Sequence, residues 1–245
     1  MIPALADTTA LVLAGGLGTR LRSVVSDRPK VLARVAGRPY LAHLLDQLAD
    51  AGLRRVVLCT GYRADQIQLS FGARYRELDL LYSEEGQPLG TAGALRLALP
   101  HADSETLLVL NGDSYCAADL SAFWCFHEGH SRSAPSASLV LTEAAETCRF
   151  GRVDINSKGA VTRFLEKGDA GGPGLINAGI YLLDRALVES IPAAQPVSLE
   201  RDVYPNRIAR GLYGFATSSA FIDIGTPESY AAADRFFQTL HLRAA

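Results

Sequence analysis

The sequence predicts an α/β fold built on a doubly wound sheet. Short apolar runs alternate with helical patterns through the first half of the chain, and several of these runs end in glycine or polar residues. A continuous apolar run is typical of a strand buried on both faces, as strands in parallel sheets are. Repeated strand–helix units of this kind predict parallel strands joined by right-handed crossovers.

The first half contains four expected strands and three expected helices. The strands span residues 9–14, 55–60, 78–83 and 106–110, and the helices span 39–51, 64–71 and 91–99. In the first helix, apolar residues recur at helical spacing, and Gly52 follows as a C-terminal stop. Thr91 is expected to cap the third helix.

Polar loops follow three of these strands and begin after Ala14, Ser83 and Leu110. In doubly wound sheets, ligands bind at the carboxyl ends of the strands. The three loops are therefore expected to form one site at a single edge of the sheet.

After about residue 136 the pattern changes to short strands with short connections. The expected strands span 137–142, 151–155, 161–166, 176–183, 213–216 and 221–224, and the expected helices span 198–210 and 227–240. This pattern predicts a small β-rich extension that closes over the site. Because 48% of the 245 residues are hydrophobic, the chain can bury one sizeable core, and we expect one domain with halves of about 8–135 and 136–245.

The composition argues against several classes of protein. A net charge of −2 and a pI near 6.2 leave no basic excess that would neutralise a nucleic acid or an anionic membrane. No apolar stretch approaches the ~20 residues that span a bilayer, and no signal peptide is evident, so we expect a cytoplasmic protein. The four cysteines lack CxxC spacing and are expected to be free thiols, namely Cys59, Cys116, Cys125 and Cys148.

The first candidate site is the glycine-rich loop Gly15-Gly16-Leu17-Gly18-Thr19-Arg20. Glycine lets the backbone approach a ligand closely, so that successive N–H groups point at phosphate oxygens, and Arg20 adds a permanently charged fork. A simple tight turn is the alternative. The loop is not a Walker A motif, because no Gly-Lys-Ser/Thr follows, and Leu21 replaces the third glycine of the dinucleotide fingerprint.

Lysine is rare in this chain, which has only Lys30, Lys158 and Lys167 among its 24 lysines and arginines. A lysine is a flexible point charge that can follow a phosphate through a reaction. Lys30, which follows Pro29, is therefore a candidate phosphate ligand, with an exposed surface lysine as the alternative.

Two aspartates are placed to bind a metal. Asp113 follows an apolar strand, and Asp223 is flanked by apolar residues. Mg²⁺ prefers carboxylate and phosphate oxygens, and an aspartate is costly to bury without a partner. A loop or helix cap for Asp113 and a bridge to an arginine for Asp223 are the alternatives, but the pair beside a phosphate loop favours a metal.

A further set of polar residues follows in the second half. Glu166 and Lys167 end an expected strand, and a glycine-rich segment then leads to Asn177. A carboxylate, an ammonium group and a carboxamide in succession supply acceptors and donors for the hydroxyls and phosphate of a sugar phosphate. A solvated charge pair is the alternative for Glu166 and Lys167.

Several motifs occur in a fixed order along essentially the whole chain: Ala14-Gly15-Gly16-Leu17-Gly18-Thr19-Arg20-Leu21, Pro29-Lys30, Leu89-Gly90-Thr91-Ala92-Gly93, Gly112-Asp113, Glu166-Lys167, Asn177-Ala178-Gly179 and Asp223-Ile224-Gly225-Thr226. As a set they resemble the sugar-1-phosphate nucleotidylyltransferases. Within that family, segments 12–35, 108–113, 174–177 and 221–225 look most like the guanylyltransferases of D-glycero-α-D-manno-heptose 1-phosphate. One departure is Val31-Leu32, where relatives often carry a second proline.

The resemblance implies a Rossmann-like mixed sheet of the GT-A-like fold, with helices on both faces. It implies in-line transfer of a nucleoside monophosphate from an NTP to a sugar 1-phosphate, with release of pyrophosphate and no covalent intermediate. The expected cofactor is Mg²⁺, and the expected partners are these two small molecules. A homo-oligomer is common in the family.

The same resemblance implies roles for individual residues. The catalytic residues would be Arg20, Lys30 and Lys167, and the metal ligands would be Asp113 and Asp223. The sugar would contact Gly151, Glu166, Lys167 and Asn177. The nucleotide would contact Leu13, Ala14, Gly15, Gly16, Gly18, Thr19, Arg20, Glu85, Pro88, Gly90, Thr91, Asn111 and Gly112.

Residues 83–91 resemble the guanine-reading loop of mannose 1-phosphate guanylyltransferases, with Glu85 at the carboxylate position. A carboxylate accepts from guanine N1–H and the 2-amino group together, a pair of donors that uracil and thymine lack. GTP is therefore the expected nucleotide. The alternatives are another sugar such as mannose or glucose 1-phosphate, a non-catalytic regulatory paralogue, and a Rossmann oxidoreductase, which the glycine spacing disfavours.

Overall fold

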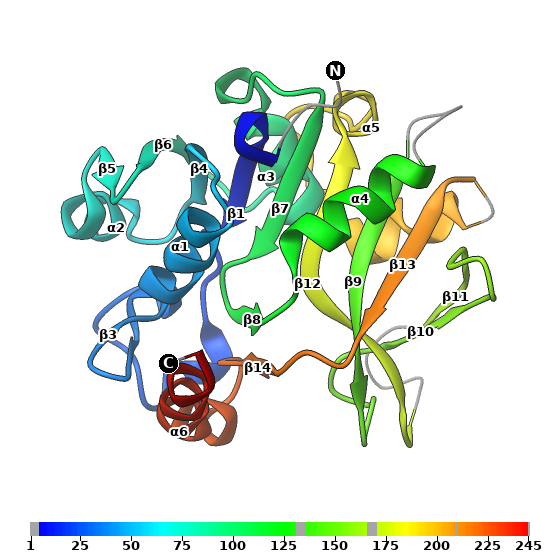
Figure 1. The fold of residues 1–245 in the computed structure, drawn as a ribbon. Helices are drawn as coiled ribbons and strands as arrows, with labels where there is room; N and C mark the ends of the chain where they lie inside the picture. The colour runs from blue at the N-terminus through cyan, green and yellow to red at the C-terminus, as the bar shows by residue number, and fades with distance from the viewer. Residues whose placement is uncertain (1–4, 131–135, 166–170, 209, 245) are drawn as a thin grey trace.

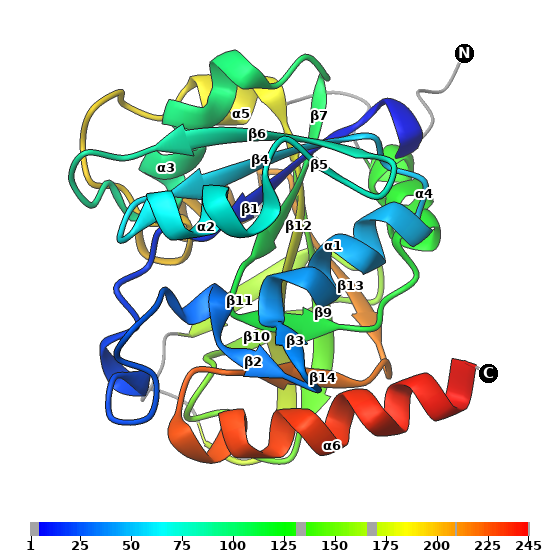
Figure 2. The same cartoon turned by 90° about the vertical axis from the view of Figure 1, so that its left-hand side faces the viewer.

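The computed structural model describes residues 5–130, 136–165, 171–208 and 210–244 (Figure 1). A twisted mixed sheet runs through the middle of the molecule, and helices cover both of its faces (Figure 1 and Figure 2). The predicted α/β fold with a mixed sheet is confirmed. In the part of the chain that the structure describes, no helix is long and apolar enough to cross a membrane.

The strands of the main sheet are β1 (Thr9–Leu13), β4 (Arg55–Thr60), β5 (Arg74–Tyr75), β6 (Leu78–Glu84), β7 (Thr106–Asn111), β9 (Ala137–Ala144), β10 (Arg152–Ile155), β11 (Val161–Leu165), β12 (Gly174–Asp184) and β13 (Leu212–Thr217). Their order is β11-β10-β12-β7-β1-β4-β6-β5, and β9 joins β12 to β13. Strands β7, β1, β4 and β6 are parallel, whereas β12 runs antiparallel to β7 and β9. Two small antiparallel pairs are β2 (Arg34–Val35) with β3 (Arg38–Pro39), and β8 (Ser114–Cys116) with β14 (Phe221–Asp223).

The α-helices are α1 (Tyr40–Asp50), α2 (Ala64–Phe71), α3 (Gly90–Ala98), α4 (Leu120–His130), α5 (Arg185–Glu189) and α6 (Pro227–Ala244). Each central strand buries both of its faces, because its side chains alternate between two cores. Ala10 and Val12 of β1 pack in one core with α1, α2, α4 and α6, whereas Leu11 packs in the other core with α3 and α5. The sheet is thus wound on both sides, as the apolar runs predict.

The parallel strands end at one level. Leu13 at the end of β1 pairs with Cys59 of β4 on one side and with Asn111 of β7 on the other. Thr60 of β4 pairs in turn with Glu84 of β6. The loops that follow β1, β6 and β7 therefore start beside one another.

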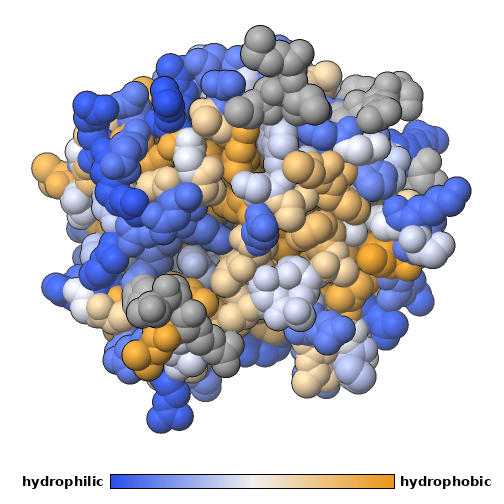
Figure 3. Space-filling model, in the orientation of Figure 1, coloured by the Kyte–Doolittle hydropathy of each residue, from blue (hydrophilic) through white to orange (hydrophobic). Residues whose placement is uncertain are grey.

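Helix α4 is not predicted from the sequence. In α4, polar residues occupy some of the positions at which a regular helical pattern would have apolar ones. One of these polar residues, His127, is fully buried. The His127 ring is satisfied inside the core, because Nδ1 lies 2.9 Å from Ser138 Oγ and Nε2 lies 3.2 Å from Asp184 Oδ1. Apolar side chains gather near the centre of the molecular face on which α4 lies (Figure 3).

The helix expected over 198–210 is wrong in its extent. The structure has a π-helical turn, Leu199–Val203, followed by a 3₁₀ turn, Pro205–Arg207. Proline lacks the N–H of a helical hydrogen bond and its ring clashes with the preceding turn, so a continuous α-helix cannot run through Pro205.

The segment before this turn is anchored on the start of α3. Val197 N donates to Leu89 O at 2.8 Å, and Ala92 N donates to Val197 O at 2.9 Å. Gly90 has a φ of 71°, and a Cβ at this position would lie 2.6 Å from Val197 O. The close contact brings residues 198–201 to the carboxyl edge of the sheet.

Replacing Gly90 by alanine tests this anchoring. Gly90→Ala is expected to lower the free energy of unfolding by roughly 2 kcal/mol or more, because it combines a strained φ with a backbone clash. Gly86→Ala is the matched control, since a Cβ there meets nothing within 4 Å. Urea denaturation of both variants measures the difference, and equal stabilities would contradict the anchoring.

Candidate active site

A cavity of about 670 Å³ opens at the carboxyl edge of the parallel strands. The loops after β1, β6 and β7 form one side of it, and residues from β11, β12, β14 and 198–201 form the other. Every residue predicted to bind the nucleotide lines this cavity: Leu13, Ala14, Gly15, Gly16, Gly18, Thr19, Arg20, Glu85, Pro88, Gly90, Thr91, Asn111 and Gly112. The two halves of the sequence thus meet around one space.

Glu85 is held in the cavity wall by backbone groups. Its Oε2 accepts from Leu89 N at 3.0 Å, and its own N–H donates to Thr60 O at 2.9 Å. A Cβ on Gly15 would lie 2.7 Å from Glu85 Oε1, and one on Gly61 would lie 2.9 Å from Glu85 Cγ. Only glycines at these positions leave room for the carboxylate.

The two predicted metal ligands lie side by side because their backbones are joined. Asp223 ends β14, where it pairs with Ser114 of β8, and Ile224 N donates to Asp113 O at 2.9 Å. Both carboxylates line the cavity. Asp223 Oδ1 also accepts from Gly225 N at 2.6 Å, which fixes its orientation.

Each of these carboxylates contacts a cation. Lys30 Nζ lies 2.8 Å from Asp113 Oδ2, and Arg149 Nη2 lies 3.1 Å from Asp223 Oδ2. The bridge from Asp223 to an arginine, one alternative for this residue, is therefore present. The Lys30 side chain is only 11% exposed, so the surface-lysine alternative is wrong.

The donor chemistry of this pair fits Mg²⁺. No cluster of three or more histidine, cysteine, aspartate or glutamate side chains that could hold a metal occurs among the described residues. Magnesium commonly uses only one or two protein carboxylates and completes its coordination with substrate phosphates and water. Asp113 and Asp223 offer two such carboxylates in the lining of the cavity.

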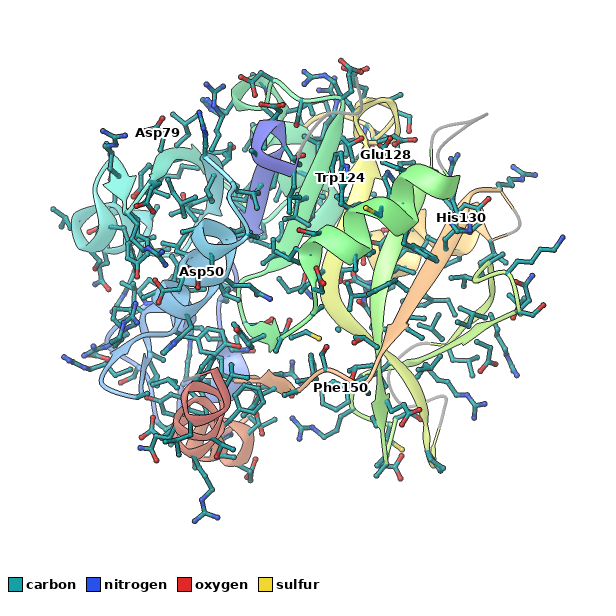
Figure 4. All side chains as sticks on the ribbon, in the orientation of Figure 1. Asp50, Asp79, Trp124, Glu128, His130 and Phe150 are labelled. Atoms are coloured by element: carbon teal, nitrogen blue, oxygen red, sulfur yellow. The ribbon has the colours of Figure 1, made fainter. Side chains whose placement is uncertain are left out.

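Of the residues predicted to contact the sugar, only some are seen to line the cavity. Asn177 of β12 lines the cavity. Gly151 does not, but its neighbours Arg149 and Phe150 do. Figure 4 shows Phe150 near β14 and the lower ends of β9 and β12. Glu166 and Lys167 lie outside the described residues.

Several cavity residues escaped the sequence prediction. They are mostly aromatic or charged and come from the second half: Arg149, Phe150, Phe164, Glu200, Arg201 and Phe221. Arg149 lies over the Phe150 ring at 5.2 Å, and Phe150 meets Phe221 edge-on at 5.6 Å. No sequence signal identifies this cluster, because the sheet brings together loops that are distant in the chain.

Cys59 also lines the cavity but is chemically inert. Burial raises the pKa of its thiol to about 12, so the nucleophilic thiolate is scarce near neutral pH. Cys59 is therefore not a candidate nucleophile of this cavity.

A family model described as "Nucleotidyl transferase" matches residues 9–239. The chain belongs to this family. The match runs from β1 into α6 and includes both sides of the cavity. The resemblance in the sequence motifs is thus confirmed, and the chain is a nucleotidyltransferase.

Relatives of known type are similar over most of this chain. It is 36% identical over 230 residues to a D-glycero-alpha-D-manno-heptose 1-phosphate guanylyltransferase of Aneurinibacillus thermoaerophilus, covering 94% of this chain and 98% of the relative. It is 36% identical over 225 residues to a mannose-1-phosphate guanylyltransferase of Mycobacterium tuberculosis, covering 90% of this chain. The chain spans only 62% of that relative's length.

Solved structures share the fold. The crystal structure of HddC from Yersinia pseudotuberculosis matches with a TM-score of 0.82 at 35% identity, covering 94% of this chain and 99% of that chain. HddC complexed with GMP-PN matches with a TM-score of 0.79 at 33% identity, over the same shares of both chains. The GT-A-like mixed sheet that the motifs imply is confirmed.

The thiols provide a test of the packing around the cavity. Cys125 and Cys148 are exposed, whereas Cys59 and Cys116 are buried and burial raises their pKa values to about 12 and about 11. Iodoacetamide is therefore expected to label Cys125 and Cys148 in the native protein, and the other two only after unfolding. Peptide mass spectrometry measures the labelling, and modification of native Cys59 would contradict the described packing.

Proposed function

We propose that this nucleotidyltransferase is a sugar-1-phosphate guanylyltransferase, which transfers GMP from GTP to a sugar 1-phosphate and releases pyrophosphate. The single observation that carries the proposal is the carboxylate of Glu85, held in the cavity wall by Leu89 N. The names of the relatives support it, since two are guanylyltransferases of sugar 1-phosphates and HddC was crystallised with GMP-PN.

Glu85 discriminates between bases through its hydrogen bonds. Guanine presents N1–H and the 2-amino group on one edge, and a carboxylate accepts from both. Uracil and thymine offer one N–H between two carbonyl oxygens, which a carboxylate repels. A site built to pair with two donors rejects a base that lacks them, because an acceptor that the bound base shields from water is then left without its partner.

The other cavity residues bind and neutralise phosphates. In the proposed reaction an oxygen of the sugar 1-phosphate attacks the α-phosphorus of GTP in line, and the bond to the β-phosphate breaks. The glycine-rich loop would hold the β- and γ-phosphates with its N–H groups, and Arg20 and Lys30 would offset the charge that develops on the leaving pyrophosphate. Mg²⁺, held by Asp113 and Asp223, would supply further neutralisation of the triphosphate when bound.

The proposed reaction would require the two ion pairs of the site to exchange partners on binding. Lys30 and Arg149 neutralise the two aspartates in the structure. If Asp113 and Asp223 held a metal ion, Lys30 and Arg149 would become available to phosphate oxygens. Lys167 would hold the sugar phosphate, and Asn177, Gly151 and Glu166 would contact the sugar, as the family motifs imply.

For the sugar we propose D-glycero-α-D-manno-heptose 1-phosphate. The relative named for this substrate is 36% identical to this chain over 230 residues, and the heptose-like segments 12–35, 108–113, 174–177 and 221–225 support the same sugar. Mannose 1-phosphate is the second candidate, because the mannose relative is just as similar over the shared region.

A matrix of substrates tests the reaction and the base. Pyrophosphate release is measured for GTP, ATP, UTP, CTP and dTTP, each with heptose, mannose and glucose 1-phosphates and Mg²⁺. GTP is expected to be preferred, and Glu85→Gln is expected to reduce that preference by at least about tenfold, because the amide NH₂ opposes the guanine donors. Glu84→Gln, an exposed neighbour, is the matched control. No turnover with any pair would refute the function, and an unchanged preference in Glu85→Gln would refute the role of Glu85.

The two aspartates are tested separately. Asp113→Asn and Asp223→Asn are each expected to lower kcat by about a hundredfold or more, because each removes a charged ligand that stabilises the reacting triphosphate. Asp79→Asn is the control, since Asp79 is exposed at the start of β6, far from the carboxyl edge (Figure 4). Titration with Mn²⁺ checks metal binding directly, and normal kcat with normal metal affinity in either variant would contradict the assignment.

A further inference from the structure

A buried tyrosine connects two side chains of the cavity wall. Tyr181 of β12 is completely buried, and its hydroxyl accepts from Asn177 Nδ2 at 2.9 Å and from Asn111 Nδ2 at 3.2 Å. Asn177 and Asn111 both line the cavity, whereas Tyr181 lies behind them. The three residues link β12 to the carboxyl end of β7.

The path of β12 makes this contact possible. Residues four apart in a regular strand are separated by roughly 13 Å, too far for Asn177 to reach the Tyr181 hydroxyl if both side chains stand perpendicular to the strand. The register of β12 shifts between these two residues. Gly179 lies in the shift with a φ of 79°, and a Cβ there would collide with Ser114 Oγ. Bulges of this kind re-aim side chains next to active sites.

The hydrogen bonds fix which way the Asn177 amide faces. Gly179 N lies 3.0 Å from one amide atom of Asn177, and because a backbone N–H can only donate, that atom is the oxygen Oδ1. Nδ2 therefore faces Tyr181. One of its two N–H bonds points at the Tyr181 hydroxyl, and the other has no acceptor among the described residues, while the side chain lines the cavity.

Burial, the largest effect, raises the pKa of Tyr181 well above its ordinary value. The side chain keeps its proton, so it remains a neutral phenol rather than a charged group behind the site. A neutral phenol oxygen accepts from two N–H donors without drawing cations into the core.

We propose that Tyr181 is a positioning residue of the sugar subsite, whose hydroxyl locks Asn177 so that one amide N–H faces a sugar hydroxyl. This inference rests on the proposed function, since it assigns the cavity beside Asn177 to the sugar. The subsite would select a substrate that offers an acceptor oxygen at that point. Tyr181 would act only through Asn177, without touching the substrate.

The test is a double-mutant cycle with KM for the sugar 1-phosphate as the readout. Tyr181→Phe removes only the hydroxyl, and it is expected to raise this KM by about tenfold, the size of one good hydrogen bond, with kcat changed by less than about threefold. Asn177→Ala is expected to raise KM by at least as much. The double variant is expected to match Asn177→Ala alone, because coupled residues do not add.

The chain offers a matched control in Tyr204. This tyrosine is also completely buried and its ring lies 5.6 Å from that of Tyr181, but its hydroxyl has no hydrogen-bond partner among the described residues. Tyr204→Phe therefore deletes a hydroxyl from the same core with no amide to release, and its KM is expected to stay within about twofold of wild type.

The outcomes separate the inference from the proposed function. The assay uses heptose or mannose 1-phosphate, whichever the wild-type enzyme turns over, with saturating GTP. If the wild type turns over none of the pairs in the substrate matrix, the proposed function fails and the inference fails with it. If the wild type is active but Tyr181→Phe has the KM of Tyr204→Phe, or if the effects of Tyr181→Phe and Asn177→Ala multiply, only the inference is overturned.

A second variant covers the case in which Tyr181→Phe is too unstable to assay. Asn177→Asp keeps the oxygen that accepts from Gly179 N and replaces the amide donor by an oxygen, to which the Tyr181 hydroxyl can donate. An increase of about tenfold in the sugar KM supports the inference, and an unchanged KM overturns it.

Discussion

Two carboxylates held side by side by the backbone are the constraint on which the rest of the site depends. The bond from Ile224 N to Asp113 O ties the C-terminal segment to the end of β7, so Asp113 and Asp223 cannot move apart without breaking the β8–β14 pair. Like charges at such a place need opposite charge nearby. Lys30 and Arg149 supply it in the structure, and a metal ion with its phosphates would supply it in a complex. This pattern of charges matches the proposed ligand, a metal ion with a nucleoside triphosphate.

The sheet supplies the geometry for this arrangement. The registers of β1, β4, β6 and β7 place the carboxyl ends of these four strands at one level. The glycine-rich loop, Glu85 and Asp113 follow directly after these ends. The antiparallel strand β12 then delivers Asn177 to that edge from the second half of the chain. Binding groups placed at strand ends are held by hydrogen-bonded backbone, which fixes them more firmly than a free loop does.

Sequence reasoning identified most of the parallel sheet, because continuous apolar runs and glycine stops are strong local signals. It missed α4, whose buried His127 is satisfied by Ser138 of β9 and Asp184 of β12. It extended a helix through Pro205 although proline disfavours one there. In the site, the loop residues and both aspartates were predictable from local motifs. Arg149, Glu200 and the aromatic residues were not, since long-range packing such as the contact of Val197 with α3 brings them to the cavity.

The groups proposed to recognise the base and the sugar share one physical device. Glu85 accepts from Leu89 N, and Asn177 accepts from Gly179 N, so in each case a backbone N–H decides which way the side chain faces. Each group also depends on glycine, because Gly15 leaves space for the carboxylate and Gly179 permits the turn in β12. The cations that face phosphates are held differently, by ion pairs that can exchange. Charge–charge attraction tolerates movement as bonds to phosphorus form and break, whereas discrimination between similar bases or sugars requires a donor or acceptor in a fixed direction. Rigid backbone anchoring therefore suits the recognition groups, and exchangeable pairing suits the groups that act on the phosphates.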